Sequence, residues 1–435
     1  MTKHKTRWIL LSLPLFILLC IGLYNFPPVY ERLSWRLAGL QTRIHYYFNP
    51  PDQVSLSPNQ QIDQIVQATM NAYATQNAQL ATQNSLPAAA TNTPEGPVAT
   101  PAHSPTPTLT PAPIPAQATI SGIRHEYQSF NNCGPANLSM ILNYWGWSGD
   151  QRNTKEWLRP NEDDSNVMPE EMAAFINQTT NLNVILRTGG SPDLLKRFIA
   201  AGFPVIIESG HQPPKDWWMG HYVLVSAYND PQSFFTTQDS LIMPDLPMPY
   251  EEIESRWWRD FNRVYLVAYP PERESEIFSI LGADADPQTN LYNTLSQTEA
   301  EIPTLTGRDL FFALFNKGAT LYHLDQKDAS ALTFDQAFTL YDTLTEDERP
   351  WRVLWYRVEA YQAYYDTGRY QDVINLANAT LSMLSKRGLE ETHYWRGMAY
   401  ETLGDKEKAA FDYDIAVTLR PTYVEAQQAL ARVKE

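Results

Sequence analysis

The sequence predicts an α+β domain followed by an all-α repeat region, with a transmembrane helix at the N-terminus. Three observations support this prediction. Residues 119–271 contain helix-like segments first and strand-like segments after them, which is the order of an α+β domain. Residues 308–435 show an internal helical repeat. Residues 8–24 form an apolar, uncharged run typical of a membrane-spanning segment.

Residues 1–27 are expected to form a cytoplasmic tip and an uncleaved signal anchor. The apolar run follows Lys3, Lys5 and Arg7, and basic residues beside a span favour the cytoplasmic side. A bilayer takes about 17–25 helical residues, so the run is just long enough to cross one. We therefore expect a single-pass protein of the cell membrane, with its N-terminus inside and its main domains outside the cytoplasm.

Residues 28–82 and 83–118 connect this anchor to the folded part of the chain. The first segment places Leu33, Leu37 and Leu40 at helical spacing, which indicates a partly helical stalk beside the membrane. The second segment is rich in Pro, Thr and Ala and cannot bury a core. A disordered, extended linker is therefore expected there.

The α+β domain is expected to span residues 119–271. A helix is predicted at 134–145, where apolar residues recur every three or four positions. A second helix at 169–177 begins with a proline, which is favoured in the first helical turn. A third has Ser191 as its N-cap and Pro192 as its first residue. The predicted strands of an antiparallel sheet are 184–187, 203–208, 222–228, 234–237 and 264–269.

After a connector at 272–307, residues 308–435 carry a repeat with the spacing of the tetratricopeptide repeat. Two earlier copies match weakly and the last copy matches strongly. Each unit is a helix pair that cannot bury its apolar face alone, so three copies are expected to stack into a short solenoid. A packing module and a groove for a protein partner both fit this pattern. The matching residues of the last copy are Gly397, Tyr400, Gly404, Ala409, Tyr413, Ala416 and Pro421.

The charge balance excludes one class of partner. The chain has 33 Lys and Arg against 49 Asp and Glu, a formal net charge of −16, and no basic run follows the extreme N-terminus. Binding to nucleic acid needs clustered Lys and Arg, so no nucleic acid partner is expected. The sequence predicts no cofactor and no metal.

Cys133 is the most informative residue for function. It is the one cysteine outside the apolar N-terminal segment, so it has no partner for a disulfide within the predicted domains. It lies where a loop becomes a helix, and a helix N-terminus stabilises the thiolate, which is the nucleophilic form. We therefore interpret Cys133 as the nucleophile of a cysteine hydrolase.

Such an enzyme also needs a base, a group that orients the base and donors for the oxyanion. His221 opens a predicted buried strand, so it can face a helix tip as the base. Asp239 ends the next strand, and a hairpin centred near Pro231 places residue 239 opposite residue 223, at the same end as His221. Gln128, five residues before the predicted nucleophile, can donate its amide N–H to the oxyanion.

The order of these residues resembles the papain-like double-glycine (bacteriocin-processing) cysteine peptidases, and more closely their free-standing branch outside transporters. The resemblance covers residues 119–271 and implies a papain-like cysteine peptidase-like domain that cleaves peptide bonds. Two features depart from the pattern. Asn132 stands where the best-known members carry Asp, and the chain has no transporter or nucleotide-binding motif, so their leader substrate is not carried over. The implied roles are Cys133 as nucleophile, His221 as base, Asp239 as orienting acid and Gln128 as oxyanion residue.

Other interpretations of these residues stay open. Cys133 can be a small apolar core residue. His211 is a rival base, expected in an irregular loop with Pro213 and Pro214. A zinc site of Cys133, His211 and His221 lacks paired-ligand spacing. For the whole chain, a cysteine peptidase acting on a peptide or protein substrate is the leading hypothesis. The alternatives are an amidase or acyl transferase with the same residues, and a catalytically silent adaptor that binds peptides or proteins.

Overall fold

The computed structural model describes residues 40, 43–48, 55–56, 114–213, 217–386 and 388–435. Apart from residues 114 and 115, the described residues belong to one compact unit. The predicted span at 8–24 and most of the predicted stalk and linker lie outside the described residues. Within the described ranges, no helix combines the length and the hydrophobicity needed to cross a bilayer.

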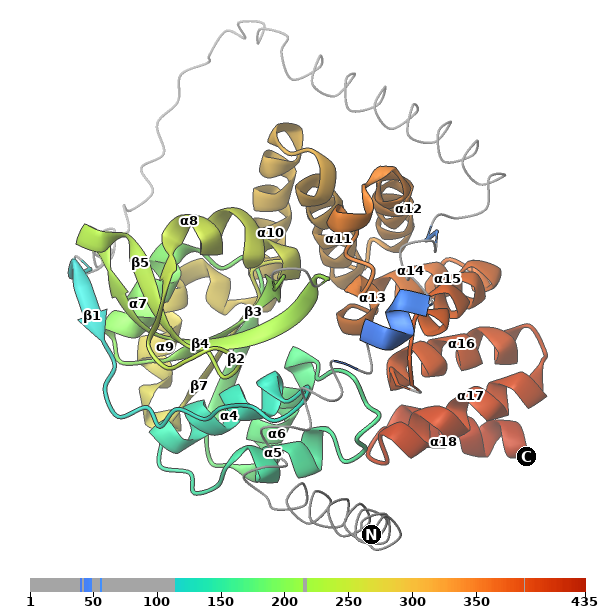
Figure 1. Ribbon diagram of the computed structural model, residues 1–435, viewed down its shortest axis with the longest axis horizontal. Helices are drawn as coiled ribbons and strands as arrows, with labels where there is room; N and C mark the ends of the chain where they lie inside the picture. Colours follow the sequence, from blue (N-terminus) through green and yellow to red (C-terminus); the bar gives the residue numbers. More distant parts are fainter. Residues whose placement is uncertain (1–39, 41–42, 49–54, 57–113, 214–216, 387) are drawn as a thin grey trace, which may run out of the picture. The chain divides into compact units, whose positions relative to one another are not determined.

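A seven-stranded antiparallel sheet forms the centre of the N-terminal part of the folded chain (Figure 1). The strand order is β2-β7-β3-β4-β5-β6, and β1 pairs with β4. The strands are β1 (Gln117–Thr119), β2 (Asn183–Arg187), β3 (Val205–His211), β4 (Met219–Asn229), β5 (Phe234–Gln238), β6 (Leu246–Pro249) and β7 (Tyr265–Tyr269).

All five predicted strands are confirmed, with ends that shift by up to three residues. The sequence analysis missed β1 and β6. β1 has only three residues, and β6 reads Leu-Pro-Met-Pro, in which two prolines lack the N–H that a sheet ladder needs. β6 pairs with β5 alone at the end of the strand order, so its prolines interrupt no second ladder.

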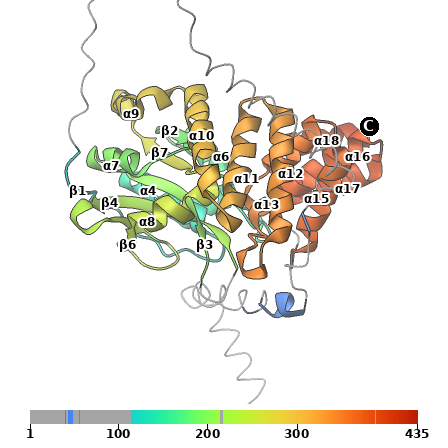
Figure 2. The ribbon, with the colours of Figure 1, turned by 90° about the horizontal axis from the view of Figure 1, so that it is seen from above.

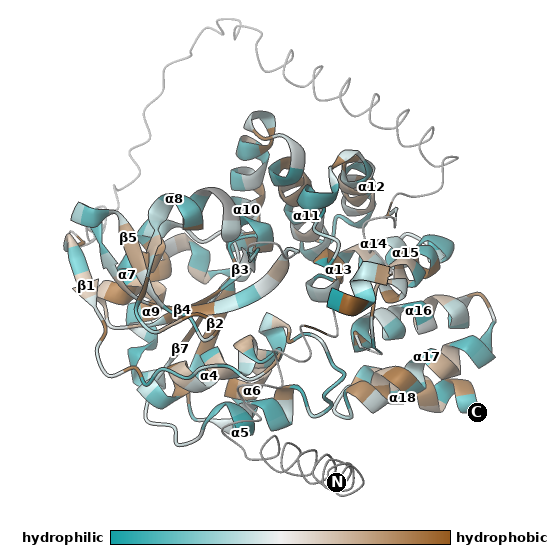
Figure 3. Ribbon diagram, viewed as in Figure 1, coloured by the Kyte–Doolittle hydropathy of each residue, from teal (hydrophilic) through white to brown (hydrophobic). Residues whose placement is uncertain are grey.

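Helices cover both faces of the sheet. α4 (Cys133–Tyr144) and α6 (Pro169–Thr179) share a buried apolar cluster with Leu224 of β4 and Leu266 of β7. The neighbouring residue Tyr265 points to the opposite face, where its ring lies 6.0 Å from that of Phe198 on α7 (Pro192–Ala200). Figure 3 shows the hydrophobic residues concentrated in the central strands. The three helices predicted from the sequence are confirmed, and α5 (Gln151–Leu158) is an addition.

The C-terminal part of the chain is helical, and α10, α11 and α12 lie side by side (Figures 1 and 2). Glycines allow close contact within the helix pairs: a Cβ atom on Gly318 of α11 would lie 3.0 Å from Phe334 of α12, and one on Gly397 would lie 2.7 Å from Tyr413. These pairs agree with a helical repeat, and the tetratricopeptide assignment stays a prediction. The helices are α9 (Glu274–Leu281), α10 (Pro287–Glu301), α11 (Gly307–His323), α12 (Lys327–Thr343), α13 (Val353–Tyr356), α14 (Glu359–Asp366), α15 (Tyr370–Ser382), α16 (Glu390–Thr402), α17 (Lys406–Leu419) and α18 (Val424–Lys434).

The helical region shares a hydrophobic cluster with residues of the sheet region, separate from the cluster beneath α4 and α6. Trp218 directly precedes β4 and is 3% exposed. Its ring lies 5.1 Å from that of Phe312 on α11. Its indole N–H donates to Asp260 Oδ2 at 2.7 Å, and Arg308 of α11 forms an ion pair with the same carboxylate. Arg352 donates to the Trp218 carbonyl oxygen at 3.2 Å. Apolar contact and buried polar bonds therefore hold the helices against the sheet.

Candidate active site

Cys133 is half-buried and is the first residue of α4, which begins one residue before the predicted helix at 134–145. The tip of α4 is pressed against neighbouring chain segments. A Cβ atom on Gly134 would lie 3.2 Å from the Val167 side chain and 3.5 Å from the Tyr222 ring. A glycine at this position therefore allows the helix start, with its unpaired backbone N–H groups, to approach β4.

His221 and Asp239 meet beside this helix tip. Leu224 of β4 pairs with Gln238 of β5, which is the register that the sequence predicts for residues 223 and 239. The turn itself is offset by one residue, and a β-bulge between Val225 and Ala227 absorbs the offset. His221 Nε2 lies 3.0 Å from Asp239 Oδ1, and both side chains are buried.

Asp239 is held in place by its own loop. Its Oδ1 atom accepts hydrogen bonds from the backbone N–H groups of Leu241 at 2.8 Å and Ile242 at 3.0 Å. Burial would raise the pKa of Asp239, but the charge and the hydrogen bond of His221, with these two N–H groups, lower it below its usual range. The carboxylate is therefore ionised next to the imidazole.

The thiol and the imidazole form an interacting pair. Burial alone would raise the pKa of Cys133, but a hydrogen bond and the charge of His221 lower it, helped by the backbone N–H groups of Tyr222 and Gly134. Burial alone would lower the pKa of His221, but Asp239 and Cys133 raise it to about 10. Both shifts favour a thiolate next to an imidazolium. Because Asp239 occupies Nε2, Nδ1 is the ring nitrogen left for the hydrogen bond with the thiol.

Gln128 lies beside the same loop. Its backbone N–H donates to the Ser240 carbonyl oxygen, and its side-chain Oε1 accepts from Ser240 Oγ, both at 2.8 Å. The oxygen end of the carboxamide therefore faces Ser240, and the amide N–H₂ end faces away from it. This orientation is compatible with the predicted oxyanion role.

Asn137 is a positioning residue that the sequence analysis missed. It is fully buried, and its Nδ2 donates to the Cys133 carbonyl oxygen at 2.9 Å and the Tyr222 carbonyl oxygen at 2.8 Å, with Ser240 Oγ at 3.3 Å. One amide group thus joins α4, the strand that carries His221 and the loop after β5. The sequence did contain a signal for this role: Asn137 is a polar residue one turn before Ile141, on the apolar face of the predicted helix. A polar side chain on such a face is expected to form buried hydrogen bonds.

The placement of His211 is a correction. The sequence analysis expected an irregular loop, but His211 is the last residue of β3, paired with Met219 of β4. Its ring centroid lies 5.4 Å from that of His221. The strand continues three residues beyond its predicted end at residue 208. The bond to Asp239 belongs to His221.

The helical region also lines the site, although the sequence predicted no site residue there. A Cβ atom on Gly220, next to His221, would lie 2.8 Å from the Phe261 ring and 3.0 Å from the ring of Tyr356 of α13. Arg357 acts on the buried carboxyl of Glu208, which pairs with Tyr222 across the ladder. Burial raises the pKa of Glu208 well above its usual range, and Arg357 opposes this rise. The site is therefore built by both regions.

A separate cavity of about 530 Å³ lies away from these residues. Arg259, Arg263 and Glu301 are among its lining residues, and the two guanidinium groups pair with Glu301 at 3.2 and 2.6 Å. Its lining residues include no cysteine and no histidine, so this cavity provides no group comparable to Cys133.

A family model and a solved structure resemble part of the chain. A family model described as the Peptidase_C39 like family matches residues 113–265. A solved crystal structure of a C39-like peptidase from Bacillus anthracis is similar at 17% identity and a TM-score of 0.30, covering 35% of this chain and 96% of that chain. No curated protein matches the chain. The family match supports a C39-like, cysteine peptidase-like domain with an antiparallel sheet at residues 113–265, in the region where the resemblance was found.

Proposed function

We propose that this chain is a cysteine peptidase that hydrolyses peptide bonds, with Cys133 as nucleophile, His221 as base and Asp239 as the carboxylate that orients the base. The observation that most supports this proposal is the series of contacts from the thiol to His221 and from His221 Nε2 to Asp239 at 3.0 Å. The position of Cys133 at a helix N-terminus also favours the thiolate.

The mechanism follows from these contacts. The Cys133 thiolate attacks the peptide carbonyl carbon and forms a C–S bond, while the Gln128 amide and the Cys133 backbone N–H stabilise the oxyanion. The tetrahedral intermediate collapses, the C–N bond breaks, and the His221 imidazolium gives its proton to the leaving amine. Neutral His221 then takes a proton from water as the water attacks the thioester. Release of the carboxylic acid restores the thiolate and the imidazolium.

The charge state of the thiol is the most direct test. In a Cys20→Ser background, where Cys133 is the one thiol, we expect iodoacetamide to react with an apparent pKa below the roughly 8.5 of free cysteine. In His221→Ala the reaction should shift to higher pH, because burial still acts on the thiol while the imidazolium is lost. The measurement is the alkylation rate as a function of pH.

His211→Ala is the matched control, since it removes a neighbouring imidazole that does not bond to Asp239. We expect the alkylation rate of His211→Ala to depend on pH as it does in the Cys20→Ser protein. A thiol that is inert, or that titrates like free cysteine in all three proteins, contradicts the peptidase proposal and favours a silent adaptor. An amidase or acyl transferase would give the same titration, so a peptide substrate screen must follow a positive result.

Residues 1–27 tether the enzyme to the cell membrane in this proposal, with the other domains outside the cytoplasm. The apolar run at 8–24 and the basic residues before it support the tether. We expect the full chain to stay with membranes during alkaline carbonate extraction, and a chain beginning at residue 28 to be released. Release of the full chain under the same conditions would contradict a spanning anchor.

A further inference from the structure

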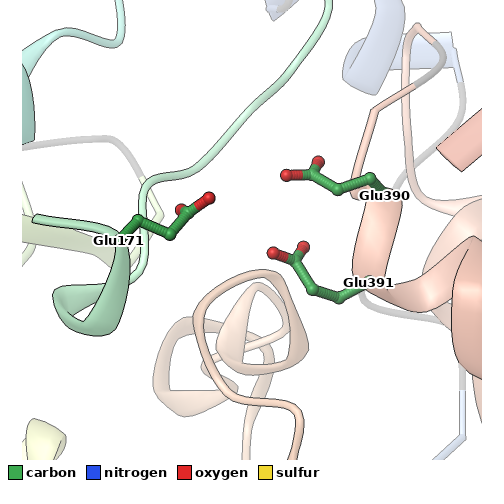
Figure 4. Close-up of side chains that lie close together, drawn as sticks. All are labelled: Glu171, Glu390 and Glu391. Carbon is green, nitrogen blue, oxygen red and sulfur yellow. The ribbon is translucent and has the colours of Figure 1, made fainter. Parts of the chain in front are cut away.

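Three buried glutamates from distant parts of the chain meet at one point. Glu171 lies in the first turn of α6, and Glu390 and Glu391 are the first two residues of α16. Figure 4 shows their carboxylates pointing toward one another. One oxygen from each lies within 4.8 Å of the others, and all three residues are buried. We call these residues the three-glutamate cluster.

The cluster lacks the hydrogen bonds that buried carboxylates normally have. Among the described residues, both carboxylate oxygens of Glu390 and Oε1 of Glu391 have no hydrogen-bond partner, although Glu390 is 0% exposed. Glu171 is the exception, because its Oε2 accepts the Met168 N–H at 2.7 Å. Buried polar atoms in proteins are nearly always paired, so unpaired oxygens of this kind call for a ligand or a proton.

A second group of side chains approaches the cluster from the loop before α6. Asp164 and Asn166 are 1% and 5% exposed. Asp164 Oδ2, Asn166 Oδ1 and Asn166 Nδ2 have no hydrogen-bond partner within the described residues. The Asn166 side chain lies next to Glu391. Its amide oxygen is a further potential cation ligand.

The two chain segments are held close together at this point. A Cβ atom on Gly388, just before α16, would lie 2.7 Å from Ser165 Oγ and 2.8 Å from the Asp163 carbonyl oxygen. Asn161 Nδ2 donates to the Thr418 carbonyl oxygen of α17 at 3.1 Å. The oxygen atoms are therefore gathered by packed backbone and not by flexible side chains alone.

The cations already present do not balance the acids. Arg420 Nη1 lies 2.6 Å from Glu171, 3.5 Å from Glu391 and 3.9 Å from Glu390. The Arg159 guanidinium, which also acts on Asp164, donates its hydrogen bonds to backbone carbonyls. Two guanidinium groups therefore face four buried carboxylates, those of Glu171, Glu390, Glu391 and Asp164, and a divalent cation would supply the missing positive charge.

The donor set favours one class of ion. It consists of oxygen atoms alone, which suit hard divalent cations better than zinc or copper. Calcium takes six to eight oxygens at about 2.3–2.6 Å, so two ligands of one ion can be about 5 Å apart. Magnesium requires near-ideal octahedral geometry at about 2.0–2.1 Å, which is a tighter shell. The 4.8 Å spread of the three-glutamate cluster fits calcium better.

We propose that Glu171, Glu390 and Glu391, with Asp164 and Asn166, bind one Ca²⁺ ion that joins the sheet region to α16 of the helical region. This site is independent of the proposed peptidase activity. Glu171, Asp164 and Asn166 belong to one side of the contact, and Glu390 and Glu391 to the other. An ion that binds only when both sides are in place stabilises the assembled fold.

The test uses the full chain in detergent after EDTA treatment, with CaCl₂ as the probe. We expect calorimetric titration to find one Ca²⁺ per chain and the unfolding temperature to rise with Ca²⁺ concentration. The Glu390→Gln/Glu391→Gln variant should fold in EDTA, because it removes buried charge, and should bind Ca²⁺ at least about tenfold more weakly. If that variant fails to fold, Glu390→Gln alone gives the same comparison.

Glu407→Gln, a change at an exposed position of α17, is the matched control and should keep the full Ca²⁺ response. The proposal would be overturned if calorimetry found no heat of binding and the unfolding temperature did not change with Ca²⁺ concentration. The three-glutamate cluster would then be interpreted as protonated. An equal response to MgCl₂ would overturn the choice of calcium. A response unchanged in both glutamine variants would place the ion elsewhere.

Discussion

The Cys133→Ala variant is expected to lose hydrolysis of a quenched fluorogenic peptide library, with kcat/KM falling by at least about 10³-fold. The reason is that no other group at the site can form the covalent intermediate. His221 and Asp239 are already committed to each other through Nε2 at 3.0 Å. Cys133→Ser should be nearly as inactive, since a hydroxyl is a far weaker acid than the thiol and gives its proton to the imidazole less readily.

The stability of these variants should change little. Cys133 is half-buried at the first position of α4, and alanine is a good helix former that removes only one sulfur atom. Denaturant unfolding measures this directly. Cys20→Ser is the control, because it removes the other cysteine of the chain and should keep full activity. Undiminished hydrolysis by Cys133→Ala would mean that the nucleophile lies elsewhere.

The Asp239→Asn variant is expected to lower kcat/KM by about 10²- to 10⁴-fold and to narrow the pH profile. Asparagine can still accept from the Leu241 and Ile242 N–H groups, so the loop should keep its shape. What is lost is the negative charge that helps raise the pKa of His221 to about 10. The imidazolium then loses its proton at lower pH, and the alkaline limb of the profile moves toward neutral pH.

The charge of His221 also makes folding stability depend on pH, because the pKa of His221 differs between the folded and the unfolded chain. His221 has a pKa of about 10 in the folded chain against a usual 6.5, so its charge favours folding fully below pH 6.5, and this contribution is lost as pH rises through about 10. Asp239→Asn should reduce that contribution. Asp245→Asn is the control, because Asp245 accepts from Gln238 at 2.7 Å and has no bond to His221. If kcat/KM depended on pH in the same way in Asp239→Asn and in Asp245→Asn, the orienting role of Asp239 would be contradicted.

The sequence predicted the parts of the site that depend on local pattern. Apolar spacing predicted the start of α4 to within one residue, and the turn near Pro231 predicted the register in which Leu224 pairs with Gln238. Proline at the first position marked the starts of α6 and α7. α5 was not predicted, because its eight residues contain only two large apolar side chains, which are too few to show a helical period.

The contacts that could not be predicted join segments far apart in the sequence. The bonds of Asn137 to Tyr222 and Ser240 exist only once α4 lies against β4. The three-glutamate cluster is a similar case. Glu171 and Glu390 lie at helix starts, where acidic residues are ordinary because they favour the helix dipole. Nothing local distinguishes them from exposed residues at the same helical positions.

The shared hydrophobic cluster bears on how such a chain can change over evolution. Trp218 packs against Phe312 of α11 and Tyr356 of α13, with ring centroids 5.1 and 5.9 Å away. A substitution at any of these three positions alters the fit of the other two. We therefore expect the contact residues of the sheet region and of the helical region to vary together.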